Sequence, residues 1–109
     1  MLAISGNARI FFCTKSIDMR NGFEGLSGLV ESLKLGELTS GAYFVFLNRQ
    51  RDKMKVLYWD GDGLVIWYKR LERGTFRKDV EAPCLDRRSF FMLLEDIVPR
   101  KLGIRFKIA

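Results

Sequence analysis

The chain has 109 residues, of which 48% are hydrophobic, enough for one compact domain and too few for two. No apolar run approaches the roughly 18–20 residues of a membrane-spanning helix, and no secretory signal is visible, so a cytoplasmic protein is expected. The formal net charge is +6, and residues 1–48 hold four basic and four acidic side chains, so the positive excess lies within residues 49–109. Such an excess attracts polyanions, although it also serves as a plain solubility surface.

The first predicted elements are a strand and an amphipathic helix. Residues 9–13 are short, apolar and β-prone, which favours a strand. The segment 22–34 predicts a helix, because its apolar residues recur at spacings of three, four and seven. These residues are Phe23, Leu26, Leu29, Val30 and Leu33.

The ends and the glycines of this helix carry further predictions. Asp18 or Asn21 is expected to cap its start, and Gly36 is expected to end it. Gly25 and Gly28 each cost about 1 kcal/mol relative to alanine inside a helix. We therefore predict that these two glycines allow close approach of another backbone.

The middle of the chain predicts three strands, two of them in a hairpin. Residues 43–47 favour a strand, and the polar segment 48–52 connects it to the next one. Residues 53–59 and 64–71 alternate and flank an Asp-Gly turn, which is a strong hairpin signal because Gly61 accepts a positive φ.

After the hairpin, residues 75–78 favour a further short strand and Pro83 marks a loop. The segment 86–98 predicts a second helix, with Asp86 as its cap and Pro99 as its end. Short turns between strands, with two separate helices, predict an α+β fold built on an antiparallel sheet of about four to five strands. A partly open barrel is the alternative closure.

The chain is predicted to be a single domain, residues 1–109, in which residues 99–109 form a basic C-terminal extension. The tail 100–109 holds four basic residues and no acidic one. Its Ile104, Phe106 and Ile108 alternate with basic residues, which is compatible with a late edge strand.

The hairpin fixes which side chains share a face of the sheet. A two-residue or four-residue turn places Trp59 opposite Leu64. One face then holds Lys53, Lys55, Leu57, Trp59, Leu64, Ile66, Tyr68 and Arg70. The other face holds Met54, Val56, Tyr58, Val65, Trp67 and Leu71, interrupted by Lys69, and is the expected core.

Two interpretations of the first face remain open. In one, the cations follow phosphates while exposed rings stack on bases, as in sequence-tolerant single-strand binders. In the other, its apolar residues form a second core layer under the other helix, with the lysines at the rim. The predicted nucleic-acid-binding residues are Arg49, Arg51, Lys53, Lys55, Trp59, Tyr68, Arg70 and Arg73.

The sequence offers little for catalysis or metal binding. It has no histidine, and Cys13 and Cys84 lack CxxC spacing, so no zinc site is expected and both are predicted to be buried, reduced thiols. Asp60 and Asp62 form the obvious carboxylate pair, yet a calcium loop starting at Asp60 would need an acidic residue where Leu71 stands. We therefore predict no enzyme activity, no metal and no cofactor.

Several motifs together resemble a known family. They are Asp18-Met-Arg20, Gly22-Phe23, Gly25-Leu26, Trp59-Asp-Gly-Asp-Gly63, and Lys69-Arg-Leu-Glu-Arg-Gly74 with Phe76. In combination and order, these motifs resemble the accessory protein encoded by the second open reading frame, of the TnpB type, in insertion sequences of the sixty-six family. The resemblance implies a bacterial mobile-element protein that assists transposition, while a separate transposase carries the catalytic carboxylates.

Three functions follow from these observations. The first is a non-catalytic accessory protein for DNA transposition that binds DNA, the transposase of the same element, or both. The second is a pure protein–protein interaction module of the transposase complex. The third is a metal-dependent nuclease that uses Asp60, Asp62 and a remote carboxylate such as Asp18 or Glu72.

Overall fold

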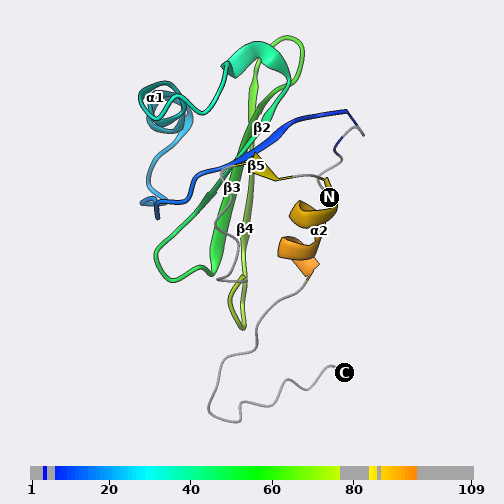
Figure 1. The fold of residues 1–109 in the computed structure, drawn as a ribbon. Coiled ribbons are helices and arrows are strands. Elements are labelled where there is room, and N and C mark those ends of the chain that lie inside the picture. The colour runs from blue at the N-terminus through cyan, green and yellow to red at the C-terminus, as the bar shows by residue number, and fades with distance from the viewer. Residues whose placement is uncertain (1–3, 5–6, 77–83, 86, 96–109) are drawn as a thin grey trace.

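The computed structural model describes residues 4, 7–76, 84–85 and 87–95. Within them the chain forms a five-stranded sheet between two α-helices (Figure 1). The elements are β1 (Ile10–Phe12), α1 (Phe23–Ser32), the 3₁₀ turn η1 (Leu38–Ser40), β2 (Tyr43–Leu47), β3 (Lys53–Trp59), β4 (Leu64–Arg70), β5 (Cys84–Leu85) and α2 (Arg87–Glu95).

The strands lie in the order β4-β3-β2-β1-β5. Strands β2 and β3, β3 and β4, and β1 and β5 pair antiparallel, whereas β1 and β2 pair parallel. The parallel pair follows from α1, because the crossover that contains this helix returns the chain to the end of the sheet where β1 began. The predicted α+β fold with two helices is therefore confirmed, with a mixed, open sheet in place of a purely antiparallel one or a barrel.

The β3–β4 hairpin has the predicted register. Trp59 lies opposite Leu64, and the pairing continues to Lys53 opposite Arg70. The turn spans four residues, since the Asp60 N–H donates to the Gly63 carbonyl at 2.8 Å. Gly61 has a φ of 85°, in the left-handed region that glycine enters at little cost.

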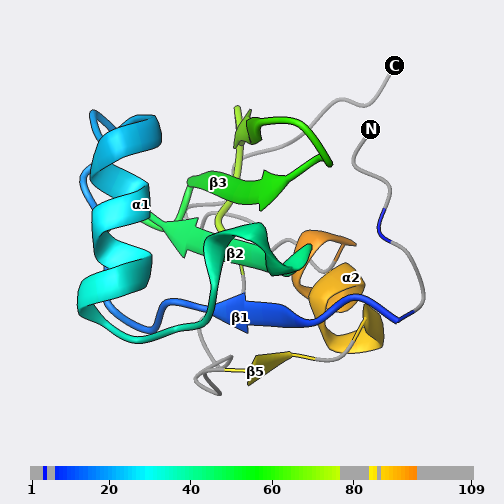
Figure 2. The same cartoon turned by 90° about the horizontal axis from the view of Figure 1, so that it is seen from above.

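Each α-helix covers part of one face of the sheet. Figure 2 shows α1 and α2 on opposite sides of the strands. On the α2 side, Phe90 and Leu93 pack with the predicted core face of the hairpin, including Met54 and Val56. On the α1 side, Leu26 and Val30 form a second cluster.

This second cluster settles the apolar part of the other hairpin face. Leu57, Leu64 and Ile66 belong to it, so these residues form the second core layer that was one of the two sequence interpretations. Lys53 and Tyr68 remain partly or largely accessible at the end of the same face, away from the 60–63 turn.

The start of α1 differs from the prediction. Gly22 is the N-cap residue, and no side chain caps the helix. The Asp18 carboxylate accepts hydrogen bonds from Arg20, and the Asn21 amide donates to the Asp18 carbonyl at 2.9 Å. Both predicted caps are therefore used within the turn that precedes the helix.

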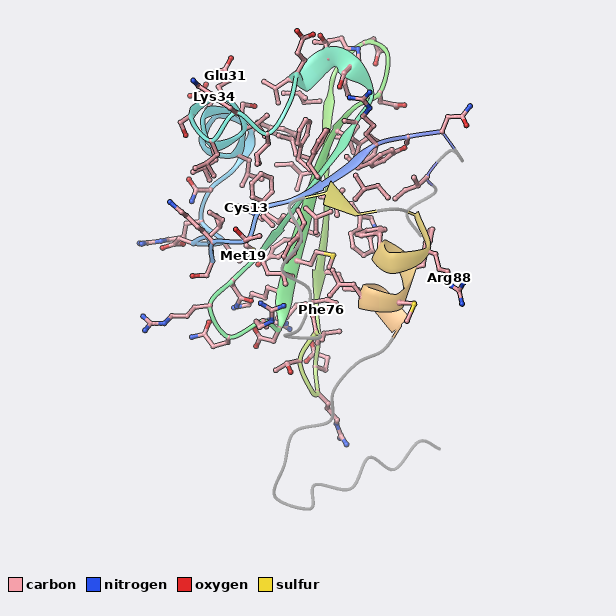
Figure 3. The ribbon with its side chains drawn as sticks, viewed as in Figure 1. Cys13, Met19, Glu31, Lys34, Phe76 and Arg88 are labelled. Carbon is pink, nitrogen blue, oxygen red and sulfur yellow. The ribbon has the colours of Figure 1, made fainter. Side chains whose placement is uncertain are left out.

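The end of α1 also differs, because Lys34 takes the position usually held by glycine. Lys34 has a φ of 53°, and its N–H donates to the Glu31 carbonyl at 3.2 Å. The Leu35 N–H donates to the Val30 carbonyl at 3.0 Å, which completes a Schellman motif. Figure 3 shows Glu31 and Lys34 on the outer side of this helix end.

The glycines near α1 have other roles than predicted. A Cβ on Gly36 would lie 3.2 Å from the Phe11 ring and 3.3 Å from the Phe44 ring, so this glycine permits tight packing on aromatic residues. A Cβ on Gly25 would meet the Asn21 side chain, and one on Gly28 would meet nothing within 4 Å. The predicted close backbone approach at Gly25 and Gly28 is therefore wrong.

Several predictions fall partly or wholly on residues outside the described ranges. Thr75 forms an isolated bridge, but the rest of the predicted strand 75–78 is not described. Pro83, Asp86 and the extension 99–109 also lie outside the described residues. In the part of the chain that the structure describes, no helix is both long and apolar enough to cross a membrane.

Candidate nucleic-acid interface

The turn between β2 and β3 presents two of the predicted basic residues, Arg49 and Arg51. It lies at the end of the sheet opposite the 60–63 turn (Figure 1). Arg49 is exposed, whereas Arg51 is half-buried and has a φ of 59°. The Arg51 carbonyl accepts the Phe76 N–H at 2.8 Å, which ties the chain after β4 to this turn.

A buried asparagine organises the same turn. Asn48 is only 6% exposed, and its Oδ1 accepts the N–H groups of Asp52 and Lys53 at 3.0 and 2.9 Å. Its Nδ2 donates to Asp52 Oδ1 at 2.7 Å and to Gln50 Oε1 at 3.2 Å. Asparagine satisfies turn backbone groups in this way, so Asn48 fixes the directions in which the turn presents its cations.

Lys55 is the predicted site residue whose position differs most from expectation. It is 8% exposed, and its Nζ donates to the Met19 and Asn21 carbonyls at 2.7 Å each. The same Nζ lies 4.7 Å from the centroid of the Tyr68 ring. Grouping Lys55 with the exposed lysines was therefore incorrect, because the loop before α1 folds over its ammonium group.

Beside Lys55 the surface is hollowed into a groove of about 600 Å³, which we call the basic groove. Its walls are the loop 16–20 and the turn 48–50, and its remaining lining residues are Lys53 and Tyr68. Figure 3 labels Met19 on the first wall, on the α1 side of the sheet. Three residues of the predicted set, Arg49, Lys53 and Tyr68, thus meet in one depression.

Arg20 also lines this groove, although it is not one of the nucleic-acid-binding residues predicted from the sequence. Its guanidinium forms an ion pair with Asp18 at 2.7 Å, and its side chain remains 91% exposed. Hydrogen bonds from the Arg20 side chain and backbone lower the pKa of the Asp18 carboxyl to about 2. The Asp18-Met-Arg20 motif contains this residue. Arg20 was not predicted to bind nucleic acid because residues 1–48 have equal numbers of basic and acidic side chains.

A smaller hollow adjoins the basic groove and extends the cationic surface. It is lined by Lys15, Arg49 and Arg51 among other residues, and it shares Arg49 with the basic groove. Lys15 is exposed and, like Arg20, comes from the first half of the chain. The positive surface is therefore built from two distant segments and not from residues 49–109 alone.

Arg70 and Arg73 lie toward the same end of the sheet. Arg70 stands opposite Lys53 in the hairpin and forms an exposed ion pair with Glu72 at 3.0 Å. Arg73 is exposed in the loop after β4. This loop is anchored to the β2–β3 turn at both ends, since the Leu71 N–H donates to the Asp52 carbonyl at 2.7 Å and Phe76 bonds Arg51.

Other predicted or basic residues lie elsewhere. Trp59 is at the far end of β3, six residues from Lys53, which corresponds to about 20 Å along a strand. Arg88 is exposed on α2, on the other side of the sheet from Met19 (Figure 3). The structure therefore separates Trp59 from the cations with which the sequence analysis had grouped it.

The described residues outside this groove show little reactive chemistry. Cys13 is a buried free thiol, and burial raises its pKa. The Cys84 side chain lies outside the described part of the chain. Among the described residues, no group of three or more His, Cys, Asp or Glu side chains is placed to hold a metal ion.

Comparison with known proteins identifies the family. Residues 8–103 match the family of IS66 Orf2-like proteins. The chain belongs to this family. This is the family that the sequence motifs had indicated.

Two relatives from Sinorhizobium fredii are similar to this IS66 Orf2-like chain. The uncharacterized protein y4jC is 38% identical over 76 residues, which cover 70% of this chain and 65% of the relative. The uncharacterized protein y4hO is 43% identical over 77 residues, covering 70% of this chain and 66% of the relative. The matched region is thus slightly less than two thirds of each relative's length. No solved structure matches the chain significantly.

Proposed function

We propose that this chain is a non-catalytic accessory protein of insertion-sequence transposition that binds DNA phosphates through its basic groove. The observation that carries the proposal is the convergence of Arg20, Arg49 and Lys53 on one depression, with Lys15 and Arg51 beside it. Phosphate contact requires exposed cations held at a defined place, and both walls of this groove are fixed by hydrogen bonds.

The sequence-predicted residues contribute to the proposal unequally. Arg49, Lys53 and Tyr68 are proposed as direct contacts, with Arg51, Arg70 and Arg73 at the margin of the same surface. Lys55 is proposed to hold the groove wall in place, and Trp59 has no part in this surface.

The transposase of the same element is proposed as the protein partner, in keeping with family membership. A module that acts only through apolar docking is less well supported by the described surface. Its exposed large apolar residues are Phe23 on α1, Tyr68 on β4 and Met92 on α2. Because the two helices lie on opposite sides of the sheet, Phe23 and Met92 do not belong to one patch.

The nuclease interpretation also lacks support in the described residues. Asp60 and Asp62 are exposed in the hairpin turn, and no described group of carboxylates gathers around them. Metal-assisted phosphoryl transfer requires several convergent carboxylates. We therefore assign the two aspartates to the turn.

A salt titration tests the proposal. Binding to DNA from the ends of the element should weaken steeply between about 50 and 200 mM salt, because each phosphate contact releases counterions. Arg49→Ala combined with Lys53→Ala should lower the affinity and reduce the salt slope by about 2. Lys34→Ala combined with Arg88→Ala removes the same charge elsewhere and should change the slope much less. Undetectable binding by folded protein at 50 mM salt would refute the DNA proposal.

A further inference from the structure

We infer that the basic groove accepts an unpaired nucleotide of single-stranded DNA, with its base stacked on the Tyr68 ring. The inference rests on the proposed function and specifies the form of DNA that the groove takes. It starts from one aromatic residue, Tyr68, which is 50% exposed and lines a groove with three cations.

Tyr68 is held in a defined orientation by a buried cation. In the hairpin it stands opposite Lys55, whose Nζ lies over its ring at 4.7 Å from the centroid. That ammonium is itself fixed by the Met19 and Asn21 carbonyls. The ring therefore has a rigid support on its Lys55 side, and Tyr68 is half exposed and lines the groove, as a stacking platform requires.

The cations of the groove lie where flanking phosphates would be. Lys53 is on the same face of the hairpin as Tyr68, two residue pairs further along, which corresponds to about 7 Å along the strands. Arg49 and Arg20 project from the two walls. A nucleotide whose base stacks on Tyr68 would therefore have its phosphates near Lys53 and Arg49.

One acidic side chain in the groove lining makes the positive charge uneven between the two walls. Asp18 lines the first wall, and its carboxylate is bonded to Arg20 by the Nε and Nη2 atoms. The charge of Arg20 is thus partly compensated, whereas Arg49 belongs to the second wall and the Lys53 N–H is bonded to Asn48 of that wall. Phosphate is accordingly expected at the second wall.

The groove shape favours an unpaired base over a duplex. In a duplex each base is stacked on both faces, so only base edges and phosphates are available to a protein. Tyr68 lines the groove together with the loop 16–20 and the turn 48–50. A base can stack on its ring only after leaving the duplex stack. Stacking on aromatic side chains depends little on base identity, so weak sequence preference is expected.

The test compares labelled thymidine oligonucleotides with a duplex of equal length at the same salt concentration, using fluorescence anisotropy. The parent protein should bind the single strand more tightly than the duplex. Tyr68→Leu should weaken single-strand binding about tenfold or more and change duplex binding less than about twofold. Tyr68→Phe retains the ring and should bind within about threefold of the parent. Melting temperatures of both variants establish that they are folded.

A second measurement is independent of variant stability. Photo-crosslinking of the parent to an oligonucleotide that carries 5-iododeoxyuridine should attach the base at Tyr68, located by mass spectrometry. If a ribo-oligonucleotide also binds, and Tyr68→Leu weakens that binding equally, the same stacking site is supported. The site then does not distinguish ribose from deoxyribose.

The outcomes separate this inference from the proposed function. Equal affinity of the parent for single strand and duplex, or unchanged single-strand binding by folded Tyr68→Leu, would overturn the stacking site alone. In that case the loss of duplex binding in Arg49→Ala with Lys53→Ala would still support phosphate binding. Absence of binding to either form at 50 mM salt would overturn both.

Discussion

Replacing Lys55 by methionine is the most informative single change. The structure gives Lys55 a role in stability, whereas the sequence pattern had predicted that it binds nucleic acid. Methionine has a similar length and keeps the aliphatic stem, but it lacks the ammonium group that bonds the Met19 and Asn21 carbonyls. Lys53→Met is the matched control, since Lys53 is two residues away on the same strand and face and is more exposed.

The expected loss is worked from the two hydrogen bonds. Hydrogen bonds to charged groups contribute about 1.5–3 kcal/mol each, and the cation–π contact with Tyr68 adds up to about 1 kcal/mol. Relief of the cost of burying the ammonium offsets part of this sum. We expect Lys55→Met to lower the free energy of unfolding by about 2–4 kcal/mol, and Lys53→Met by less than about 0.5 kcal/mol.

Urea denaturation followed by circular dichroism measures both changes. For a domain of this size, the loss in Lys55→Met corresponds to a fall in melting temperature of about 8–16 °C. The loop that contains Arg20 should also open more often, so trypsin should cleave after Arg20 faster in Lys55→Met than in Lys53→Met. If the two variants are equally stable and equally resistant, the ammonium–carbonyl bonds contribute nothing and the reasoning is refuted.

Three further predictions concern local features. Gly61→Val should lower the free energy of unfolding by about 1–3 kcal/mol, because a β-branched residue resists a φ of 85°. Gly63→Val is the control and should cost clearly less, since its added Cβ meets nothing within 4 Å. Equal melting temperatures of the two variants would contradict the role given to Gly61. Gly28→Ala should raise stability by about 0.5–1 kcal/mol in the same urea assay, since the methyl group enters open space in a helix; a loss would show a hidden contact. The Asp18 carboxyl should titrate near pH 2 by NMR, so its pair with Arg20 is fully formed above pH 3.8 and is lost as pH falls through about 2; a midpoint at 3.8 would show that the pair is absent in solution.

The hairpin was predictable because its determinants are local. An Asp-Gly turn between two alternating segments fixes the register, and the register fixes which residues share a face. The buried position of Val56 on the expected core face follows directly, whereas burial of Leu57 was one of two open interpretations. The buried face of α1 was predictable for the same reason, because the spacing of four residues between Leu26 and Val30 places both on one side of a helix.

The position of Lys55 was not predictable, because its acceptors lie 34 and 36 residues away in the chain. Periodicity places a side chain on a face but does not show that a loop folds over it. The end of α1 was misplaced for a different reason. A lysine rarely occupies the left-handed region, so Lys34 gives no stop signal in the sequence.

The candidate site shows the same division. The β2–β3 turn was predicted to bind nucleic acid from its basic composition. Arg20 was missed because it reaches the groove only when the crossover between β1 and β2 places the loop 16–20 beside that turn. Counting charges along the sequence does not show that these two segments lie side by side in the fold. Trp59 and Lys53 were grouped by sharing a face, although the length of β3 separates them.

The place of β1 in the sheet has a consequence for the order in which the nascent protein folds. Of the five described strands β1 is synthesised first, yet it hydrogen-bonds β2, beyond the crossover, and β5, whose Leu85 pairs with Ile10 across 75 residues of chain. The contiguous β2–β3–β4 meander has only near neighbours to find, so it can assemble during translation. Strand β1 must then insert between the finished edge of this meander and β5, the last of the described strands to be synthesised, so its docking is the expected slow step.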